Sequence, residues 1–385
     1  MKYSRRDFGK VVAGGIPVAT AMLSGEALLT AIEPSSAAAQ AGAVEARGQG
    51  CISGDFSSNF AGVQIGNIVP YSYHGMSSEA HAVLSYLIQN GISACEMMNQ
   101  TAEPFAGAPA TRNPFFGRGR GPGRGRGPAA GRRGPFRPPQ LTPAQQAAMK
   151  AQQEAMTKWR LSVPMSKYEE LRRLYNDQGV HIYGFKLQLT DAMPDAEFDY
   201  AFRVVKALGA DQLTMEMPSL GGGLGPLLGG GKFRPDNALT KRIGQFADKY
   251  KTMVGYHAHT EATPTLWDEA MEQSPYNGIN LDIGWYVASG YDPIPFIRKN
   301  HARITSMHLK DRSHPPHFGH MWGTGKTPLK EALQLVRDNH YTFPCAVEQE
   351  YPIPAGSNSV IEVGRCVAWA KNILLSNGPG IPETA

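Results

Sequence analysis

Histidine, aspartate and glutamate recur where apolar segments of the chain end. The segment ITSMHLKDR (Ile304 to Arg312) begins as an apolar strand and ends in a histidine, a lysine and an aspartate. Four other apolar segments end in residues of the same types. The side chains at the five ends are Glu216, His257, His259, Asp282, His308, Lys310, Asp311, Glu348 and Glu350. Buried imidazoles and carboxylates are costly unless they are paired or bind a metal, so the pattern predicts a metal site.

The types of these side chains narrow the choice of metal. Mixed imidazole and carboxylate ligands suit Mn²⁺, Co²⁺, Zn²⁺ or Fe²⁺, whereas Mg²⁺ and Ca²⁺ prefer oxygen alone. The four cysteines show no C-x-x-C spacing, so we do not expect a structural zinc site. Cys95 and Cys345 lie in apolar strands and are interpreted as small buried side chains, although an exported protein could pair two cysteines.

Eight apolar segments alternate with helical patterns between Phe60 and about Leu375. Most are continuous apolar runs, which is typical of strands buried on both faces. The pattern predicts an α/β fold of the (β/α)8, or TIM-barrel, type, with a doubly wound open sheet as the alternative. In such a barrel the chemistry lies at the carboxyl ends of the strands. The expected strands are 60–67, 92–98, 180–189, 211–218, 252–259, 278–284, 304–310 and 342–350.

An insert interrupts the barrel after the second strand, over residues 104–157. Eight arginines and no acidic residue lie between Thr111 and Gln140. The tract is too poor in apolar residues to form a core, so we expect disorder there, followed by a solvated helix. Without these eight charges the formal net charge of +5 becomes −3, which argues against a structured nucleic-acid surface. Binding of RNA, lipid or a polyanion by the tract is the alternative to a solvated loop.

The first forty residues resemble a twin-arginine export signal. Arg5 and Arg6 precede an apolar stretch rich in glycine and alanine, and small residues follow it. This predicts a signal peptide over 1–40, a linker over 41–59, the barrel over 60–375 and a tail over 376–385. An uncleaved membrane anchor is the alternative, but Gly14, Gly15 and Pro17 make a poor spanning helix. We therefore expect a periplasmic or exported protein that is recognised by the twin-arginine export machinery.

The order GYHAH, LDIGW, MHLKD and VEQEY resembles the xylose isomerase-like barrel superfamily of sugar isomerases and epimerases. The resemblance covers nearly the whole body, and HLKD and the L-D-x-G pattern are its most specific parts. It implies one divalent metal held by His257, Asp282, His308 and Glu348. Two positions depart from the family pattern. His257 replaces a glutamate that shares the proton transfer, and Trp285 stands where many relatives have a histidine.

The resemblance implies an isomerase or epimerase that acts through an enediolate on a free sugar, keto-sugar or glycoside derivative. Glu348 or Glu216 would remove the proton, and Lys186, Lys310 or His259 would hold or protonate the oxygen. Glu350 could be a ligand, a supporting partner or a substrate contact, and it is a weaker candidate than Glu348. Asp311 and Glu96 are interpreted as supporting residues. Two alternative functions remain: a metal-dependent lyase or hydratase, and a non-catalytic carbohydrate-binding barrel. We expect a carbohydrate as the ligand and no nucleic acid, and the family allows a homo-oligomer.

Two glycine-rich stretches lie in predicted loops. Residues 219–233 follow the fourth strand and form either a lid or a plain loop. HMWGTGKT resembles a phosphate-binding loop, but its first glycine is missing because His320 stands in that place. Gly323, Gly325 and Lys326 are instead predicted to shape the loop after the seventh strand.

Overall fold

The computed structural model describes residues 57–110, 142–220, 233–314 and 319–376. All of them belong to one compact unit, Asp55–Ala385. The predicted TIM barrel is confirmed: eight parallel strands close on themselves, since β2 pairs with both β3 and β11. The eight barrel strands are β2 (Val63–Val69), β3 (Ala94–Met98), β4 (His181–Lys186), β5 (Gln212–Glu216), β6 (Met253–His257), β7 (Asn277–Asp282), β8 (Ile304–Leu309) and β11 (Cys345–Val347).

Every expected strand differs from the observed one in at least one bound, and three of these differences affect the site or the start of the barrel. The first breaks at Ala61 and Gly62, where positive φ angles turn the short strand β1 (Asn59–Phe60) antiparallel onto β2. The fifth and eighth are shorter than expected, so His259, Glu348 and Glu350 lie just beyond the ends of β6 and β11. Backbone pairing ends before the apolar pattern does, because the last residues of each run enter the loop at the barrel mouth.

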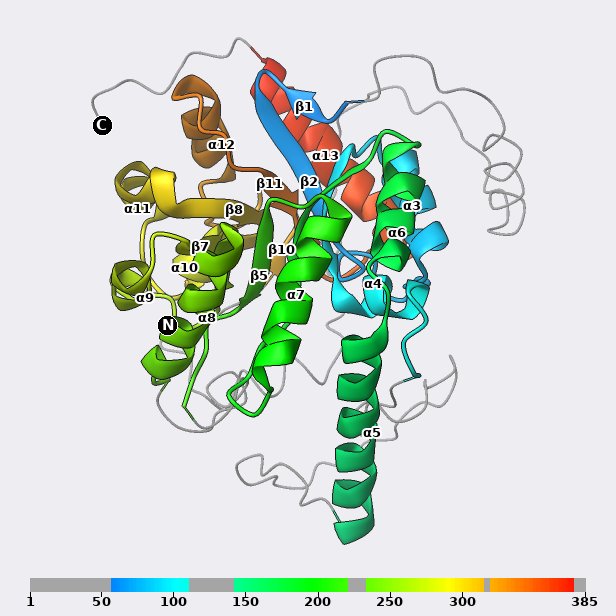
Figure 1. The fold of residues 1–385 in the computed structure, drawn as a ribbon. Helices are drawn as coiled ribbons and strands as arrows, with labels where there is room; N and C mark the ends of the chain where they lie inside the picture. Colours follow the sequence, from blue (N-terminus) through cyan, green and yellow to red (C-terminus); the bar gives the residue numbers. More distant parts are fainter. Residues whose placement is uncertain (1–56, 111–141, 221–232, 315–318, 377–385) are drawn as a thin grey trace, which may run out of the picture. The chain divides into compact units, whose positions relative to one another are not determined.

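Helices surround the sheet between successive strands (Figure 1). Gly91 and Gly209 stop α3 and α7 in the left-handed conformation, as the sequence predicts. The sequence analysis missed α4, α6, α10 and α11. The helices are α3 (Ala80–Gln89), α4 (Asn99–Phe105), α5 (Pro143–Ser162), α6 (Ser166–Asn176), α7 (Asp195–Leu208), α8 (Asn237–Tyr250), α9 (Asp268–Gln273), α10 (Ile283–Ala288), α11 (Pro293–Asn300), α12 (Leu329–Asp338) and α13 (Ser359–Leu375), with a 3-10 turn η1 (His301–Arg303).

The predicted helix after the insert is α5, and most of its residues are exposed. Thr142 and Gln145 form a capping box at its start, and Arg160 fixes its other end to the body. In Figure 1 its first turns extend away from the helices around the sheet. The arginine-rich tract, the signal sequence and most of the glycine-rich stretch 219–233 lie outside the described residues.

Three cysteines in the described part of the chain, Cys95, Cys345 and Cys366, are buried free thiols. This agrees with the interpretation of Cys95 and Cys345 as small core side chains. None of the described helices has both the length and the apolar character that crossing a membrane requires. The small strands β9 (Asp311–Arg312) and β10 (Gly319–His320) pair beside the mouth of the barrel, just after β8.

Candidate active site

Four strand ends bring four predicted metal ligands together. His257, Asp282, His308 and Glu348 come from β6, β7, β8 and the residue after β11, and each is at most 4% exposed. One ligand atom from each lies within 4.8 Å of the others. Two donors on one ion with bonds of about 2.0–2.2 Å can be at most about 4.4 Å apart, so a small contraction would allow the set to hold a metal ion. The donor types fit a transition-metal ion.

His257 points its Nε2 atom into this cluster. Its Nδ1 atom lies 2.8 Å from Oδ1 of Asn280, and its Nε2 atom lies 3.7 Å from Oδ2 of Asp282. Burial, with Lys186 and the neighbouring imidazoles, holds the pKa of His257 well below its usual value. A neutral imidazole whose Nδ1 donates outward has its Nε2 lone pair free to bind a metal. His257 could therefore serve as a metal ligand.

His308 lies between two carboxylates. Its Nδ1 atom is 2.8 Å from Oε2 of Glu348, and its Nε2 atom is 3.1 Å from Oε2 of Glu96. Burial alone would lower the pKa of His308, but the two carboxylates raise it to about 9. Glu96 is fully buried and also accepts from Thr214. Burial alone would raise the pKa of Glu96, but His308 and Lys186 lower it, so Glu96 is the ionised partner that orients His308.

The Lys310 ammonium lies between two of the ligand carboxylates. Its Nζ atom is 2.7 Å from both Asp282 and Glu348 and 3.0 Å from Glu350. Burial would lower the pKa of Lys310, but these three carboxylates raise it far above its usual value. Burial and Glu348 raise the pKa of Asp282 despite the ammonium, whereas Lys310 and His308 lower that of Glu348 in spite of its burial. Lys310 thus offsets part of the negative charge of the cluster carboxylates.

A second group of side chains flanks the cluster on the side of β4 to β6. Lys186 Nζ lies 2.9 Å from one oxygen of Glu216, and His259 Nδ1 lies 3.4 Å from the other. The Glu216 side chain is 33% exposed, so it is more accessible than any of the four cluster ligands. Burial would raise the pKa of Glu216, but Lys186 and the two histidines lower it, which keeps Glu216 ionised.

Glu216, His257 and His259 also have ligand atoms close together. They do not form an independent second metal site, because His257 has only Nε2 to offer and that atom faces Asp282. The Lys186 ammonium beside Glu216 further disfavours a cation there.

Carboxylates outnumber fixed cations in the described part of the site. Five carboxylates face three permanently charged cations, which leaves two negative charges without a fixed counter-charge. A divalent ion, or protons on the histidines, would supply the two missing positive charges. The groups counted are Glu96, Glu216, Asp282, Glu348 and Glu350 against Lys186, Lys310 and Arg312.

Glu350 holds Lys310 rather than a metal. Its second oxygen pairs with both Lys310 and Arg312, and its first accepts from the hydroxyl of Tyr71 at 2.5 Å. The Arg312 guanidinium in turn lies 3.6 Å from the ring centroid of Trp285. Trp285 therefore supports Arg312 and offers no ligand to the cluster.

Asp311 holds the loop that follows β8 rather than a metal. Its carboxylate accepts backbone N–H groups from Gly323, Gly325 and Thr327. A Cβ on Gly325 would lie 2.1 Å from an oxygen of Asp311, which explains the glycine there. The HMWGTGKT loop therefore wraps a carboxylate and is not built to hold a phosphate.

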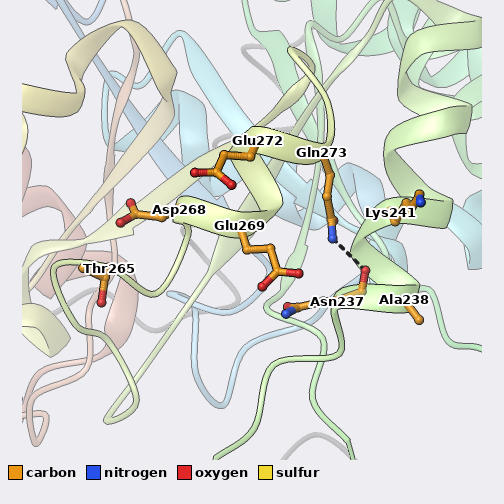
Figure 2. Close-up of a pocket in the computed structure, with 8 residues that line it drawn as sticks. All are labelled: Asn237, Ala238, Lys241, Thr265, Asp268, Glu269, Glu272 and Gln273. Carbon is orange, nitrogen blue, oxygen red and sulfur yellow. Dashed lines mark hydrogen bonds between the residues drawn. The ribbon is translucent and has the colours of Figure 1, made fainter.

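A surface hollow between the start of α8 and α9 shares no residue with the cluster. Figure 2 shows Asp268, Glu269 and Glu272 on α9, and Gln273 donates to the backbone oxygen of Asn237 at 2.9 Å. Among the described residues, those that line this hollow include none of the cluster, so the hollow is not a candidate for the chemistry.

The structure thus brings together every residue that the sequence analysis assigned to the site. Asn280, Arg312 and Tyr71 were missed. Asn280 lies two residues before Asp282, a spacing that places both side chains on one face of a strand, and this signal was available in the sequence. Tyr71 follows β2 in a loop, so only the fold places it beside Glu350.

The sequence matches no family model. No curated protein matches it either. Solved structures do share its fold. L-ribulose 3-epimerase aligns with a TM-score of 0.51 at 12% identity, over 81% of this chain and 94% of that protein.

Two further structures align equally well. The 3-keto-D-glucoside 4-epimerase YcjR from E. coli has a TM-score of 0.51 at 11% identity and covers 80% of this chain and 99% of its own. The probable 3-DHS dehydratase AsbF from Bacillus anthracis has a TM-score of 0.51 at 11% identity, with 82% and 100% covered. At such identities the likeness establishes the barrel fold alone.

Proposed function

We propose that the protein is a divalent-metal-dependent sugar isomerase or epimerase. One observation carries the proposal: four buried ligands converge at the barrel mouth, and acid–base groups lie on both sides of them. A bound Mn²⁺, Co²⁺, Zn²⁺ or Fe²⁺ ion would stabilise negative charge on the oxygens of a carbonyl and its neighbouring hydroxyl. The fold shared with L-ribulose 3-epimerase and with the 3-keto-D-glucoside 4-epimerase is consistent with a carbohydrate substrate.

Glu216 is the residue best placed to accept a proton. It is ionised, partly exposed and opposite His257 in the pairing of β5 with β6. Glu216 thus offers a carboxylate on the neighbouring strand at the same height as His257, the position where the resembled family has a glutamate. Lys186 and His259, which contact Glu216, are the donors that would hold or reprotonate the substrate oxygen on this side.

Lys310 and Glu348 act on the other side. Glu348 contacts both His308 and Lys310, so its main task is to bind the ion and to fix the ammonium. With an ion bound to Asp282 and Glu348, the Lys310 ammonium would keep its ion pair with Glu350 and could direct its other N–H groups toward a substrate oxygen. Glu216 and Lys310 would thus contact the substrate from two sides of the ion, although His257 itself cannot transfer a proton.

Proton exchange in D₂O tests this function. The metal-loaded protein should incorporate deuterium next to the carbonyl of a free sugar, keto-sugar or 3-keto-glycoside, followed by NMR. His308→Ala should lose both the bound metal and the exchange, whereas His301→Ala, at an exposed histidine on η1, should keep both. Full exchange by a demetallated sample would contradict the proposal.

The same experiment separates the alternatives. Lys186 and His259 beside Glu216 are placed to protonate a leaving group, so a lyase would release the β-substituent after the same proton removal. A carbohydrate-binding barrel would bind the sugar without any exchange.

The proposed export explains the choice of a free sugar or glycoside, because phosphorylated sugars are scarce outside the cytoplasm. Replacing the Arg5–Arg6 pair with two lysines should retain the protein in the cytoplasm, as measured by cell fractionation. Unchanged secretion would contradict twin-arginine export.

A further inference from the structure

Asn280 is a fully buried amide under the proposed metal centre. Its Nδ2 atom lies 3.0 Å from Oε2 of Glu96 and 2.9 Å from Oγ of Ser306. Its Oδ1 atom lies 2.8 Å from Nδ1 of His257. Its Nδ2 atom also lies 3.3 Å from Nε2 of His308, so Asn280 touches the rings of both predicted histidine ligands as well as Glu96.

The Glu96 carboxylate dictates how this amide is turned. A carboxylate only accepts hydrogen bonds, so the NH₂ group of Asn280 has to face Glu96. The amide oxygen then faces His257, and an oxygen requires a proton on Nδ1. The Nε2 atom of His257 is left with its lone pair, and it points at Asp282. The orientation of each group is thus set by whether its neighbour donates or accepts the hydrogen bond.

The Glu96 carboxylate also fixes the orientation of the second histidine, His308. Oε2 of Glu96 lies 3.1 Å from Nε2 of His308, so Nε2 of His308 donates and its Nδ1 faces Glu348 and the cluster. Glu96 and Asn280 thus form one connected unit that presents opposite ring nitrogens of His257 and His308 to the same point. Ser306 and Thr214 complete the unit by bonding to Asn280 and Glu96.

We infer that Asn280 is a positioning residue that makes His257 a metal ligand by fixing its Nδ1–H tautomer. This inference rests on the proposed metal-dependent function. A glutamate at position 257 would bind a metal without any partner for a ring nitrogen. The histidine requires one, and Asn280 provides it.

A double-mutant cycle tests the inference with metal affinity as the readout. Asn280→Ala should weaken Zn²⁺ or Co²⁺ binding about tenfold to a hundredfold, the usual effect of losing a partner of a ligand. In a His257→Glu background the same change should cost clearly less, because only the contacts of Asn280 with Glu96 and His308 are then lost. Chelator competition gives the affinities, and the visible spectrum of the Co²⁺ form reports whether the histidine nitrogen is bound.

The matched control is Asn277→Ala. Asn277 is equally buried on the same strand, but it bonds to Tyr256 and to backbone oxygens away from the cluster. It should lower stability and leave both metal affinity and the Co²⁺ spectrum unchanged. Equal losses of affinity from Asn280→Ala in both backgrounds would overturn the inference, because a structural role does not depend on residue 257.

A measurement on the wild-type protein guards against variants that fail to fold. With ¹⁵N-labelled histidine and bound Zn²⁺, the imidazole signal that disappears in His257→Glu should show a protonated Nδ1 and a metal-bound Nε2. The opposite assignment would overturn the inference. If the wild-type protein binds no divalent metal at all, the proposed function itself is wrong. This result differs from metal binding without energetic coupling between residues 280 and 257, which contradicts only the role of Asn280.

Discussion

Lys310 is the residue whose position most directly affects metal binding. Its ammonium lies 2.7 Å from two of the four proposed ligands, so an incoming cation meets a like charge. We expect Lys310→Met to tighten divalent-metal binding by at least about tenfold, because even partly screened charges at this distance interact by several kcal/mol. The same variant should lose turnover, since Lys310 is proposed to contact the substrate oxygen.

Chelator competition measures this effect, and Lys330→Met, at an exposed lysine on α12, is the control. Weaker metal binding in Lys310→Met would mean that the ammonium holds the ligand carboxylates in place rather than competing for them. Affinity and turnover should therefore move in opposite directions in this variant.

At the level of elements, Gly284 allows α10 to pass close to the end of β8. A Cβ at position 284 would lie 2.3 Å from Cγ of Lys310 and 2.7 Å from its backbone oxygen. The glycine of the L-D-x-G pattern is therefore required by close packing. Gly284→Ala should displace Lys310 and cost about 1–3 kcal/mol of stability, as overpacking usually does.

Urea denaturation gives the stability of Gly284→Ala, and the metal affinity reports the moved lysine. Gly364→Ala is the comparison, because a Cβ there meets only the end of the Asn90 side chain. A fully stable Gly284→Ala variant with unchanged metal affinity would contradict this account of the motif.

Arg160 attaches α5 to the barrel through a buried ion-pair network. Its guanidinium contacts Glu103 at 2.7 Å and Glu197 at 3.2 Å, and all three side chains are less than 10% exposed. Arg160→Met would leave two buried carboxylates without their cation, which typically costs about 3–5 kcal/mol.

Thermal or urea unfolding of Arg160→Met should show this loss. Lys158→Met, at an exposed position of the same helix, should stay within about 0.5 kcal/mol of the wild type. If both variants behave alike, α5 does not depend on the buried network for its attachment.

For the whole molecule, the proposed ion would join four strands of the closed barrel. His257, Asp282, His308 and Glu348 belong to consecutive neighbours in the sheet, so the ion would bind the folded barrel and not the unfolded chain. At a free metal concentration of about 100 times Kd, the folded state should gain about 2.7 kcal/mol.

The melting temperature of the full chain should therefore rise with added Mn²⁺, Co²⁺ or Zn²⁺ and fall with a chelator. His308→Ala should remove the dependence on metal. An equal rise in this variant would show that the stabilising ion binds elsewhere.

The sequence determined the architecture and most of the site. Buried parallel strands require continuous apolar segments, and parallel strands place their carboxyl ends at one edge, so the order of polar residues at those ends already predicted the cluster. The helix α6 was missed because SKYEELRRLYN is mostly polar, and only its packing shows which side chains are buried. Strand bounds were also wrong by a few residues, since apolar patterns continue into loops.

Only the tertiary structure decided what each polar group contacts. It placed Lys310 among three carboxylates and set Trp285 against Arg312. It also connected Glu96 to His257 through Asn280. These contacts join residues up to 184 positions apart in the chain, so no local pattern specifies them. The sequence predicted the four candidate ligands, partly through a family resemblance, and the closed barrel determined which of their atoms face one another.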